Sequence, residues 1–237
     1  MSAAAGALGL LNRLFRRHVG GAQRPAFFDI DATYPALRLL DRNYAVIREE
    51  LLAVLQDQER IPRYHEISKA ETYISGTVDP TRSWRVFMLA HVSGGIPTNQ
   101  ARCPRTSALL GQIPGLLQAF FSILDPGKSI PAHDGPYLGY LRYHLALLVP
   151  SVDPPSMRVK DQVHTWQEGR SILFDDSWNH QVYNTSPERR VVLIVDVVRP
   201  MAWPLHVINW LVTRVLARYS EEVQEIRANV TRYANRL

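Results

Sequence analysis

Apolar residues follow a helical spacing early in the chain and a strand-like spacing later. From Pro35 to about Gln56 they recur every three or four residues, and Pro35 suits a first helical turn. This spacing predicts one amphipathic helix over 35–56. A strand is expected over 84–90, and a short helix is expected over 106–112, where Thr106 can cap its start.

Beyond Leu116 the pattern changes to short apolar runs that are separated by turn residues. The expected strands cover 116–124, 140–149, 157–165, 171–175, 180–184 and 189–198. Several strands at this spacing are typical of an antiparallel sandwich or barrel. We therefore expect an N-terminal extension over 1–24, a main domain over 25–200 with its β core at about 84–200, and C-terminal helices over 201–237.

Composition narrows the class of protein. The chain has 237 residues, of which 46% are hydrophobic and 21% are charged, and this excludes intrinsic disorder, collagen-like repeats and a long coiled coil. The single cysteine, Cys103, excludes a disulfide framework and a thiolate-rich metal site, and it suits a reducing compartment. Any metal must therefore be held by histidine and oxygen ligands.

The N-terminal stretch combines apolar and basic residues. Leu8, Leu11, Phe15 and Val19 fall at helical spacing, arginines lie between them, and no acidic residue precedes Asp29. A helix on an anionic membrane, a transit peptide and a disordered tail all fit this pattern. Its charge follows the apolar run, which is the wrong order for a secretory signal. We expect a cytoplasmic protein without a membrane span, with peripheral membrane contact in the first of these cases.

The net charge of +5 leaves several partners open. The arginines form no run interleaved with stacking aromatic residues, so we expect no nucleic-acid partner.

The histidines of the strand region allow a geometric prediction. If strands 180–184 and 189–198 form a hairpin centred near Thr185, His180 faces Arg190 across it. On strand 140–149, Arg142 and His144 share one face by the two-residue period, opposite to the neighbouring leucines and tyrosine. These residues either line a solvent face or point into a barrel, where two neutral imidazoles from separate strands can chelate a first-row metal.

Two long segments resemble a known family. The runs SIPAHDGPYLGYLRYHLALLVP (129–150) and HTWQEGRSILFDDSWNHQVYNTSPERRVVLIVDVVRP (164–200) are similar to the aspartyl/asparaginyl β-hydroxylases, a family of Fe(II)- and 2-oxoglutarate-dependent dioxygenases that also contains bacterial lipid A and ornithine-lipid hydroxylases. The resemblance covers at least 103–201, including CPRT at 103–106. It implies a mainly β fold with flanking helices, namely the double-stranded β-helix, or cupin-like jelly roll.

The resemblance also implies roles for individual residues. His133 and His180 match the two iron ligands of the family, and Arg190 matches the arginine that binds a 2-oxoglutarate carboxylate. Ser122 resembles the hydroxyl that shares this carboxylate, and His144 resembles the imidazole at the other end of 2-oxoglutarate. For substrate binding, the resemblance nominates Arg142 and Asp176, of which Asp176 either orients a ligand of the metal or forms a turn.

One position departs from most 2-oxoglutarate oxygenases. They bind iron through two histidines and a carboxylate at H-x-D/E, but here Gly135 stands at the carboxylate position. The asparaginyl and aspartyl hydroxylases resemble this arrangement, whereas lipid A hydroxylases generally keep an aspartate. Asp134 is one place away and points to the opposite face of a strand, so we do not count it as a ligand. With two neutral ligands, iron binding should depend strongly on 2-oxoglutarate.

The implied activity is hydroxylation of an aliphatic C–H bond, with Fe(II) as cofactor, 2-oxoglutarate and O2 as co-substrates, and succinate and CO2 as products. The substrate remains open between an aspartyl or asparaginyl side chain and a lipid acyl chain. Gly135 favours the first, while CPRT, the NTSPERR turn and the basic N-terminal stretch favour the second. The alternative function is a non-catalytic, cupin-like binding protein.

Overall fold

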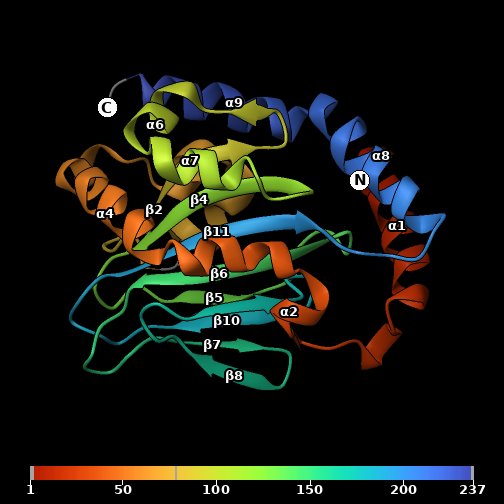
Figure 1. Ribbon diagram of the computed structural model, residues 1–237, viewed down its shortest axis with the longest axis horizontal. Coiled ribbons are helices and arrows are strands. Elements are labelled where there is room, and N and C mark those ends of the chain that lie inside the picture. The colour runs from red at the N-terminus through yellow and green to blue at the C-terminus, as the bar shows by residue number, and fades with distance from the viewer. Residues whose placement is uncertain (1–2, 78, 236–237) are drawn as a thin grey trace.

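Two antiparallel sheets face each other, with helices around them. Residues 3–77 and 79–235 are described by a computed structural model (Figure 1). The larger sheet has the strand order β1-β9-β6-β11-β4-β2-β3, and the smaller sheet has the order β5-β10-β7-β8. Strands β4 to β11 therefore alternate between the sheets, apart from the hairpin of β7 and β8 within the small sheet, which is the order of a jelly roll and confirms the expected fold class.

The strands of the jelly roll are short in the small sheet and long at the centre of the large one. The large sheet contains β1 (Phe27–Phe28), β2 (Trp84–His91), β3 (Gly94–Gly95), β4 (Leu116–Leu124), β6 (Tyr140–Leu148), β9 (Ser171–Phe174) and β11 (Arg190–Val198). The small sheet contains β5 (Ile130–His133), β7 (Ser156–Val159), β8 (Gln162–Thr165) and β10 (His180–Tyr183).

The helices lie before, between and after the strands. They are α1 (Ala3–His18), α2 (Ile30–Thr33), α3 (Arg38–Arg42), α4 (Tyr44–Val54), α5 (Tyr64–Ile67), α6 (Pro97–Arg102), α7 (Pro104–Leu110), α8 (Leu205–Arg214) and α9 (Glu221–Ala234). The predicted helices after residue 201 and near 106–112 are thus present, the latter beginning at Pro104.

Two hydrophobic cores lie on opposite faces of the large sheet. On one face, Leu145 and Leu193 pack with Leu40, Ile47 and Leu51 of α3 and α4. The inner face, with Val192 and Ile194 among its residues, packs toward the small sheet. Because the central strands are buried on both faces, most of their residues are apolar.

The prediction of one helix over 35–56 was wrong in detail. A 3₁₀ turn over Pro35–Leu37 leads into α3, and Asn43 separates α3 from α4. The Asn43 side-chain amide donates to the carbonyl of Leu39 at 2.8 Å. Asparagine commonly competes with the helical backbone in this way, and the spacing of the buried apolar residues survives the break.

Two strand predictions also need correction. The run 157–165 is two strands, because Lys160 has a φ of 56° and turns the chain between β7 and β8. The hairpin of 180–184 with 189–198 does not form: β10 pairs with β5 and β7, whereas β11 pairs with β4 and β6 in the other sheet. His180 therefore does not pair with Arg190 across a ladder.

Candidate functional site

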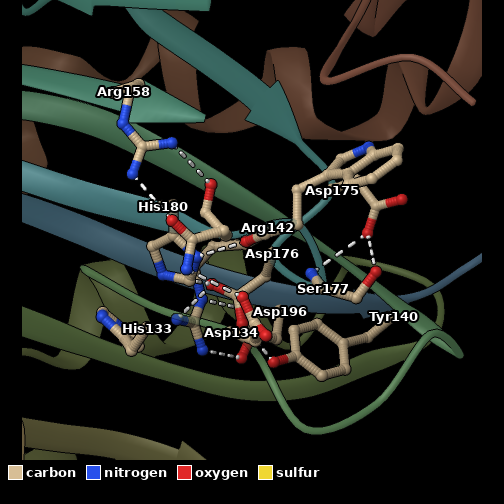
Figure 2. A network of polar contacts seen from close by, with 12 residues as sticks. His133, Asp134, Tyr140, Arg142, Arg158, Asp175, Asp176, Ser177, His180 and Asp196 are labelled. Atoms are coloured by element: carbon tan, nitrogen blue, oxygen red, sulfur yellow. Dashed lines mark hydrogen bonds and ion pairs between the residues drawn. The ribbon is translucent and has the colours of Figure 1, made fainter. Parts of the chain in front are cut away.

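His133 and His180 form the centre of the site, on neighbouring strands of the small sheet. His133 ends β5 and His180 begins β10, and the two residues are direct register partners. Their ring centroids lie 4.1 Å apart (Figure 2). The sequence missed β5 as a strand, yet this short strand brings the two family-matched histidines together.

The backbone sets the tautomer of both rings. Nδ1 of His133 lies 2.8 Å from the carbonyl oxygen of Pro131, and Nδ1 of His180 lies 2.8 Å from that of Trp178. Since a carbonyl oxygen only accepts, each Nδ1 carries the proton and each Nε2 keeps its lone pair. Burial and the adjacent His180 lower the pKa of His133 to about 4. The pair therefore offers two Nε2 donors in the form that metals bind.

A buried carboxylate lies against this pair. Oδ1 of Asp176 is 3.4 Å from Nε2 of His180 and accepts a 2.7 Å hydrogen bond from Nη1 of Arg142. The hydroxyl of Tyr140 donates to the other oxygen of Asp176. Arg142 donates from Nε and Nη2 to both oxygens of Asp196, at 2.7 and 2.8 Å (Figure 2).

Two buried carboxyl groups thus share one guanidinium. Burial acts to raise the pKa of Asp176, but Arg142 and the histidines hold it below its usual value. Burial raises the pKa of Asp196, although Arg142 opposes this shift. A cation beside His180 would stabilise the ionised form of both carboxyls, so the electrostatics of the network fit a metal ion between the histidines.

Gly135 makes room for this carboxylate. A Cβ atom at position 135 would lie 2.2 Å from Oδ2 of Asp176 and 2.6 Å from its carbonyl oxygen. A side chain at position 135, where the resemblance compares Gly135 with a carboxylate, would therefore collide with Asp176. Asp134 is exposed and accepts a hydrogen bond from Asn179 at 3.0 Å, which agrees with its exclusion as a ligand.

The opposite wall carries buried polar groups without protein partners. On the inner face of the large sheet, Arg190 is 1% exposed and donates from Nη1 to Ser122 Oγ at 3.4 Å. The same oxygen accepts from Trp84 at 2.9 Å. Within the described residues, Nε of Arg190, both ring nitrogens of His144 and Nε1 of Trp166 are buried without a hydrogen-bond partner.

This cluster places a buried guanidinium beside a tryptophan ring and a neutral imidazole. The Arg190 guanidinium lies 4.2 Å from the centroid of the Trp166 ring, and burial lowers the pKa of Arg190 to about 9. Burial and Arg190 shift the pKa of His144 well below its usual value, so its imidazole is neutral. Unpartnered buried donors are costly, and an oxygen-rich ligand would satisfy them.

The two walls face the same interior. The His144 ring lies 4.9 Å from that of Phe174, which lies 6.1 Å from His180. The predicted shared face of Arg142 and His144 is confirmed, since Leu141 and Leu145 belong to the outer core.

The structure adds residues that sequence reasoning missed and changes the setting of others. Tyr140 and Asp196 were not singled out, although alternation along their strands places both on the inner face. Trp166 is buried, and its ring lies against the guanidinium of Arg190. Arg142 is already occupied by Asp196, so the expected bond to a substrate carboxylate would have to displace a bidentate ion pair.

The candidate metal ligands are the two histidines, without a third ligand residue grouped with them in the described ranges. No group of three or more His, Cys, Asp or Glu side chains there is arranged to hold a metal ion. The histidine pair and the unpartnered cluster together fit an iron ion and a carboxylate co-substrate that completes its coordination.

The sequence was compared with known proteins. A profile of the aspartyl/asparaginyl β-hydroxylase family matches residues 41–200. The chain belongs to this family. It is 41% identical over 187 residues to an ornithine lipid ester-linked acyl 2-hydroxylase of Rhizobium tropici, covering 78% of this chain and 65% of that protein.

Other members of the family are more distant. The aspartyl/asparaginyl β-hydroxylase of Homo sapiens is 29% identical over 173 residues, which are 71% of this chain and 22% of that protein. The chain thus spans less than two thirds of the length of these relatives. Among solved structures, the cupin domain of Schizosaccharomyces pombe Cnp3 is 9% identical with a TM-score of 0.31, covering 36% of this chain and 57% of that one.

Proposed function

We propose that this member of the β-hydroxylase family is an Fe(II)- and 2-oxoglutarate-dependent dioxygenase that hydroxylates a lipid acyl chain. One observation carries the iron site: His133 and His180 are register partners, and both have their Nδ1 protons fixed on carbonyl oxygens. The two free Nε2 atoms would hold Fe(II).

The second wall of the barrel supports the co-substrate. Arg190 and Ser122 would bind one carboxylate of 2-oxoglutarate, because the guanidinium is buried and lacks a carboxylate partner among the described residues. His144 would contact the end nearer the metal, where its unpartnered ring nitrogens lie among aromatic side chains. Two neutral imidazole ligands leave the co-substrate to balance the charge of the iron.

The remaining residues would orient a ligand of the metal and keep water away from the co-substrate. Asp176 would orient a ligand of the metal, and Arg142 and Tyr140 keep its carboxylate ionised and fixed. Trp166 and Phe174 exclude water from the co-substrate cavity. When bound, iron and 2-oxoglutarate supply the oxidant that places one oxygen atom of O2 in a C–H bond, with succinate and CO2 released.

Two features favour an acyl chain over an acidic side chain as substrate. The relative from Rhizobium tropici, at 41% identity, is named for acyl 2-hydroxylation, whereas the human β-hydroxylase is 29% identical. Arg142, the residue nominated for an aspartyl carboxylate, is held by Asp176 and Asp196. A substrate without a carboxylate at the reacting carbon leaves this network intact.

The cofactor proposal is tested by anaerobic addition of Fe(II) and 2-oxoglutarate, with the metal-to-ligand charge-transfer absorbance as readout. Wild type should show the band, His180→Ala should lose it, and the control His65→Ala should keep it. Iron affinity should rise roughly tenfold when 2-oxoglutarate is present. A folded wild-type protein without the band would instead support the non-catalytic binding protein.

The substrate proposal needs a separate measurement. The iron-loaded enzyme is incubated with ornithine-containing lipids or with aspartyl and asparaginyl peptides, and mass spectrometry detects the gain of one oxygen atom. Oxygen should enter the acyl chain and not the peptides. Peptide hydroxylation alone would replace the lipid substrate by a protein side chain and leave the cofactor proposal standing.

A further inference from the structure

Helix α8 leaves several apolar residues exposed while it buries two polar ones, although its Leu205 is buried and its Ile208 and Val212 are partly buried in the cluster that contains Phe15. It buries the polar residues Asn209 and Thr213, which are 0% and 4% exposed, and it exposes Val207, Trp210 and Leu211, each between 46% and 49%. A surface helix of a globular protein normally does the reverse. The neighbouring α9 follows the ordinary rule, because it buries Val230 and Ala234 and exposes Glu221 and Glu222.

Specific hydrogen bonds fix this orientation. Oδ1 of Asn209 accepts from the hydroxyl of Tyr137 at 2.8 Å, and its Nδ2 donates to the carbonyl of Gly139 at 2.8 Å. A Cβ atom at Gly139 would lie 2.2 Å from Oδ1 of Asn209, so the approach requires glycine. Rotation of α8 to hide its apolar side would break both bonds, which means that the exposed side chains are held outward.

Helix α1 lies beside α8 and extends the exposed apolar area. The apolar stripe of α1, for which a membrane surface was one of three expectations, packs on the protein: Phe15 is fully buried, and Leu8 and Leu11 are partly buried in the cluster that contains Leu205. Leu10 and Leu14 remain 61% and 39% exposed. Figure 1 shows both helices together beyond the end of β11.

We define the α1–α8 face as the exposed apolar side chains of these helices and their flanks. It consists of Leu10, Leu14, Trp203, Val207, Trp210, Leu211, Leu216 and Tyr219. Trp203 and Tyr219 are each 80% exposed, and tryptophan and tyrosine prefer the boundary between water and lipid headgroups. Exposed apolar groups on this scale usually mark a binding surface.

The charged residues on α1 and α8 are basic, whereas exposed Glu221 and Glu222 follow only at the start of α9. Arg13, Arg16 and Arg17 flank it on α1, and Arg214 and Arg218 flank it near the end of α8. Within the described residues, the structure shows no ion pair for these five arginines. No acidic residue occurs in 1–28 or 197–220. This charge is complementary to an anionic lipid surface.

We infer that the α1–α8 face docks on the surface of an anionic phospholipid membrane. None of the described helices is long and apolar enough to cross a bilayer, so the helices would lie in the interface rather than span it. Apolar side chains would enter the headgroup region while the arginines contact lipid phosphates. This inference concerns binding alone and does not require the proposed catalytic activity.

The docking face is joined to the candidate site. Residues 134–139 connect His133 to Tyr140, and both helices hold this segment. Asn12 of α1 donates to the carbonyl of Pro136 and accepts from the amide of Leu138, each at 2.9 Å, while Asn209 of α8 binds Gly139. The two helices that would contact the membrane therefore hold the segment that directly follows His133, the proposed iron ligand.

The test measures flotation of the full chain with vesicles, without iron or 2-oxoglutarate. Phosphatidylcholine vesicles that contain phosphatidylglycerol should bind the protein, pure phosphatidylcholine vesicles should bind it weakly, and high salt should reduce binding. The Trp203→Ser/Trp210→Ser variant should lose at least about tenfold in partitioning. Arg13→Gln and Arg218→Gln should each lose up to about fivefold.

Matched controls lie on other parts of the surface. Val163→Ser removes an apolar side chain of β8 that is 66% exposed, and Arg170→Gln removes an exposed arginine. Both variants should bind vesicles as wild type does. Equal binding by the tryptophan double variant and wild type would overturn the inference. A dimer that the same variant abolishes, without vesicle binding by wild type, would assign the face to a second copy of the chain.

A second readout separates this inference from the catalytic proposal. The charge-transfer band with Fe(II) and 2-oxoglutarate should be unchanged in the tryptophan double variant, which also reports that the variant is folded. Vesicle binding without the band in wild type would support docking and contradict the dioxygenase. The band without vesicle binding would contradict docking and leave the dioxygenase intact.

Discussion

The two faces of the large sheet are built from the same strands but have opposite chemistry. On β6, Leu141, Tyr143 and Leu145 point to a core shared with α3 and α4, while Arg142 and His144 point into the barrel. On β11, Leu193 is in the outer core, whereas Arg190 lies inside with an unpartnered Nε. The two-residue period of a strand thus lets one segment serve stability on one face and ligand binding on the other.

This division implies that the outer face carries the larger share of stability. Leu193 is 0% exposed at the centre of the sheet, so Leu193→Ala should lower the free energy of unfolding by about 2–5 kcal/mol. Urea denaturation measures this change. The folded variant should still show the charge-transfer band. A loss below about 1 kcal/mol would contradict the assignment of stability to this face.

A substitution on the inner face should mainly change the affinity for 2-oxoglutarate. Arg190→Met should weaken 2-oxoglutarate binding about 100-fold, or about 2.7 kcal/mol, because the charged partner of a buried carboxylate is lost. Its stability should stay equal or rise, since an unpaired buried charge is removed. Ligand titration and urea denaturation measure the two effects. The adjacent, exposed Arg189→Met is the control and should bind 2-oxoglutarate normally.

The inner face should also make the metal-free protein sensitive to acid. His144 has a folded-state pKa well below its usual value, so the unfolded chain takes up a proton below about pH 6.5 before the folded protein does. This difference lowers the free energy of unfolding as pH falls below about 6.5. His144→Phe should flatten that part of the profile of unfolding free energy against pH.

Other histidines check the source of the acid effect. His133, with a pKa of about 4, contributes a similar slope that His144→Phe leaves in place. The exposed His206→Gln should change the profile little. An unchanged slope in His144→Phe would show that this imidazole is not held neutral by burial.

The smallest effect should occur at Cys103 in the outer core. This thiol is 0% exposed, and burial raises its pKa to about 12, so a thiolate-specific reagent should not label it in the native protein. Labelling should appear only on unfolding, with the urea midpoint measured independently. Rapid labelling under native conditions would contradict the dry character of this core.

Much of the fold and the site followed from local sequence. Strand 116–124 coincides with β4, and the strands near 140–149 and 189–198 are present with ends that differ by one residue. Alternation alone put Arg142 and His144 on one face, because side-chain direction along a strand needs no knowledge of the partner strand. The motifs around His133 and His180 carried the family, which the sequence profile confirms.

Strand pairing was decided by the tertiary structure. Proximity in sequence favoured a hairpin between 180–184 and 189–198, but β10 and β11 belong to different sheets. Long-range pairing of His180 with His133, across 47 positions of sequence, is what creates the histidine pair of the candidate site. Local sequence patterns do not predict such pairing, because its free energy comes from burial of the two sheets against each other.

The surface of α1 and α8 is a second feature that local sequence did not predict. Sequence spacing identified the apolar stripe of Leu8, Leu11 and Phe15, and the folded chain uses that stripe for its own core. On α8, hydrogen bonds with Tyr137 and Gly139 hold Asn209 inward, and Trp210 and Leu211 beside it are exposed. Residue types and their period belong to the sequence, whereas the direction in which a helix faces depends on partners far along the chain.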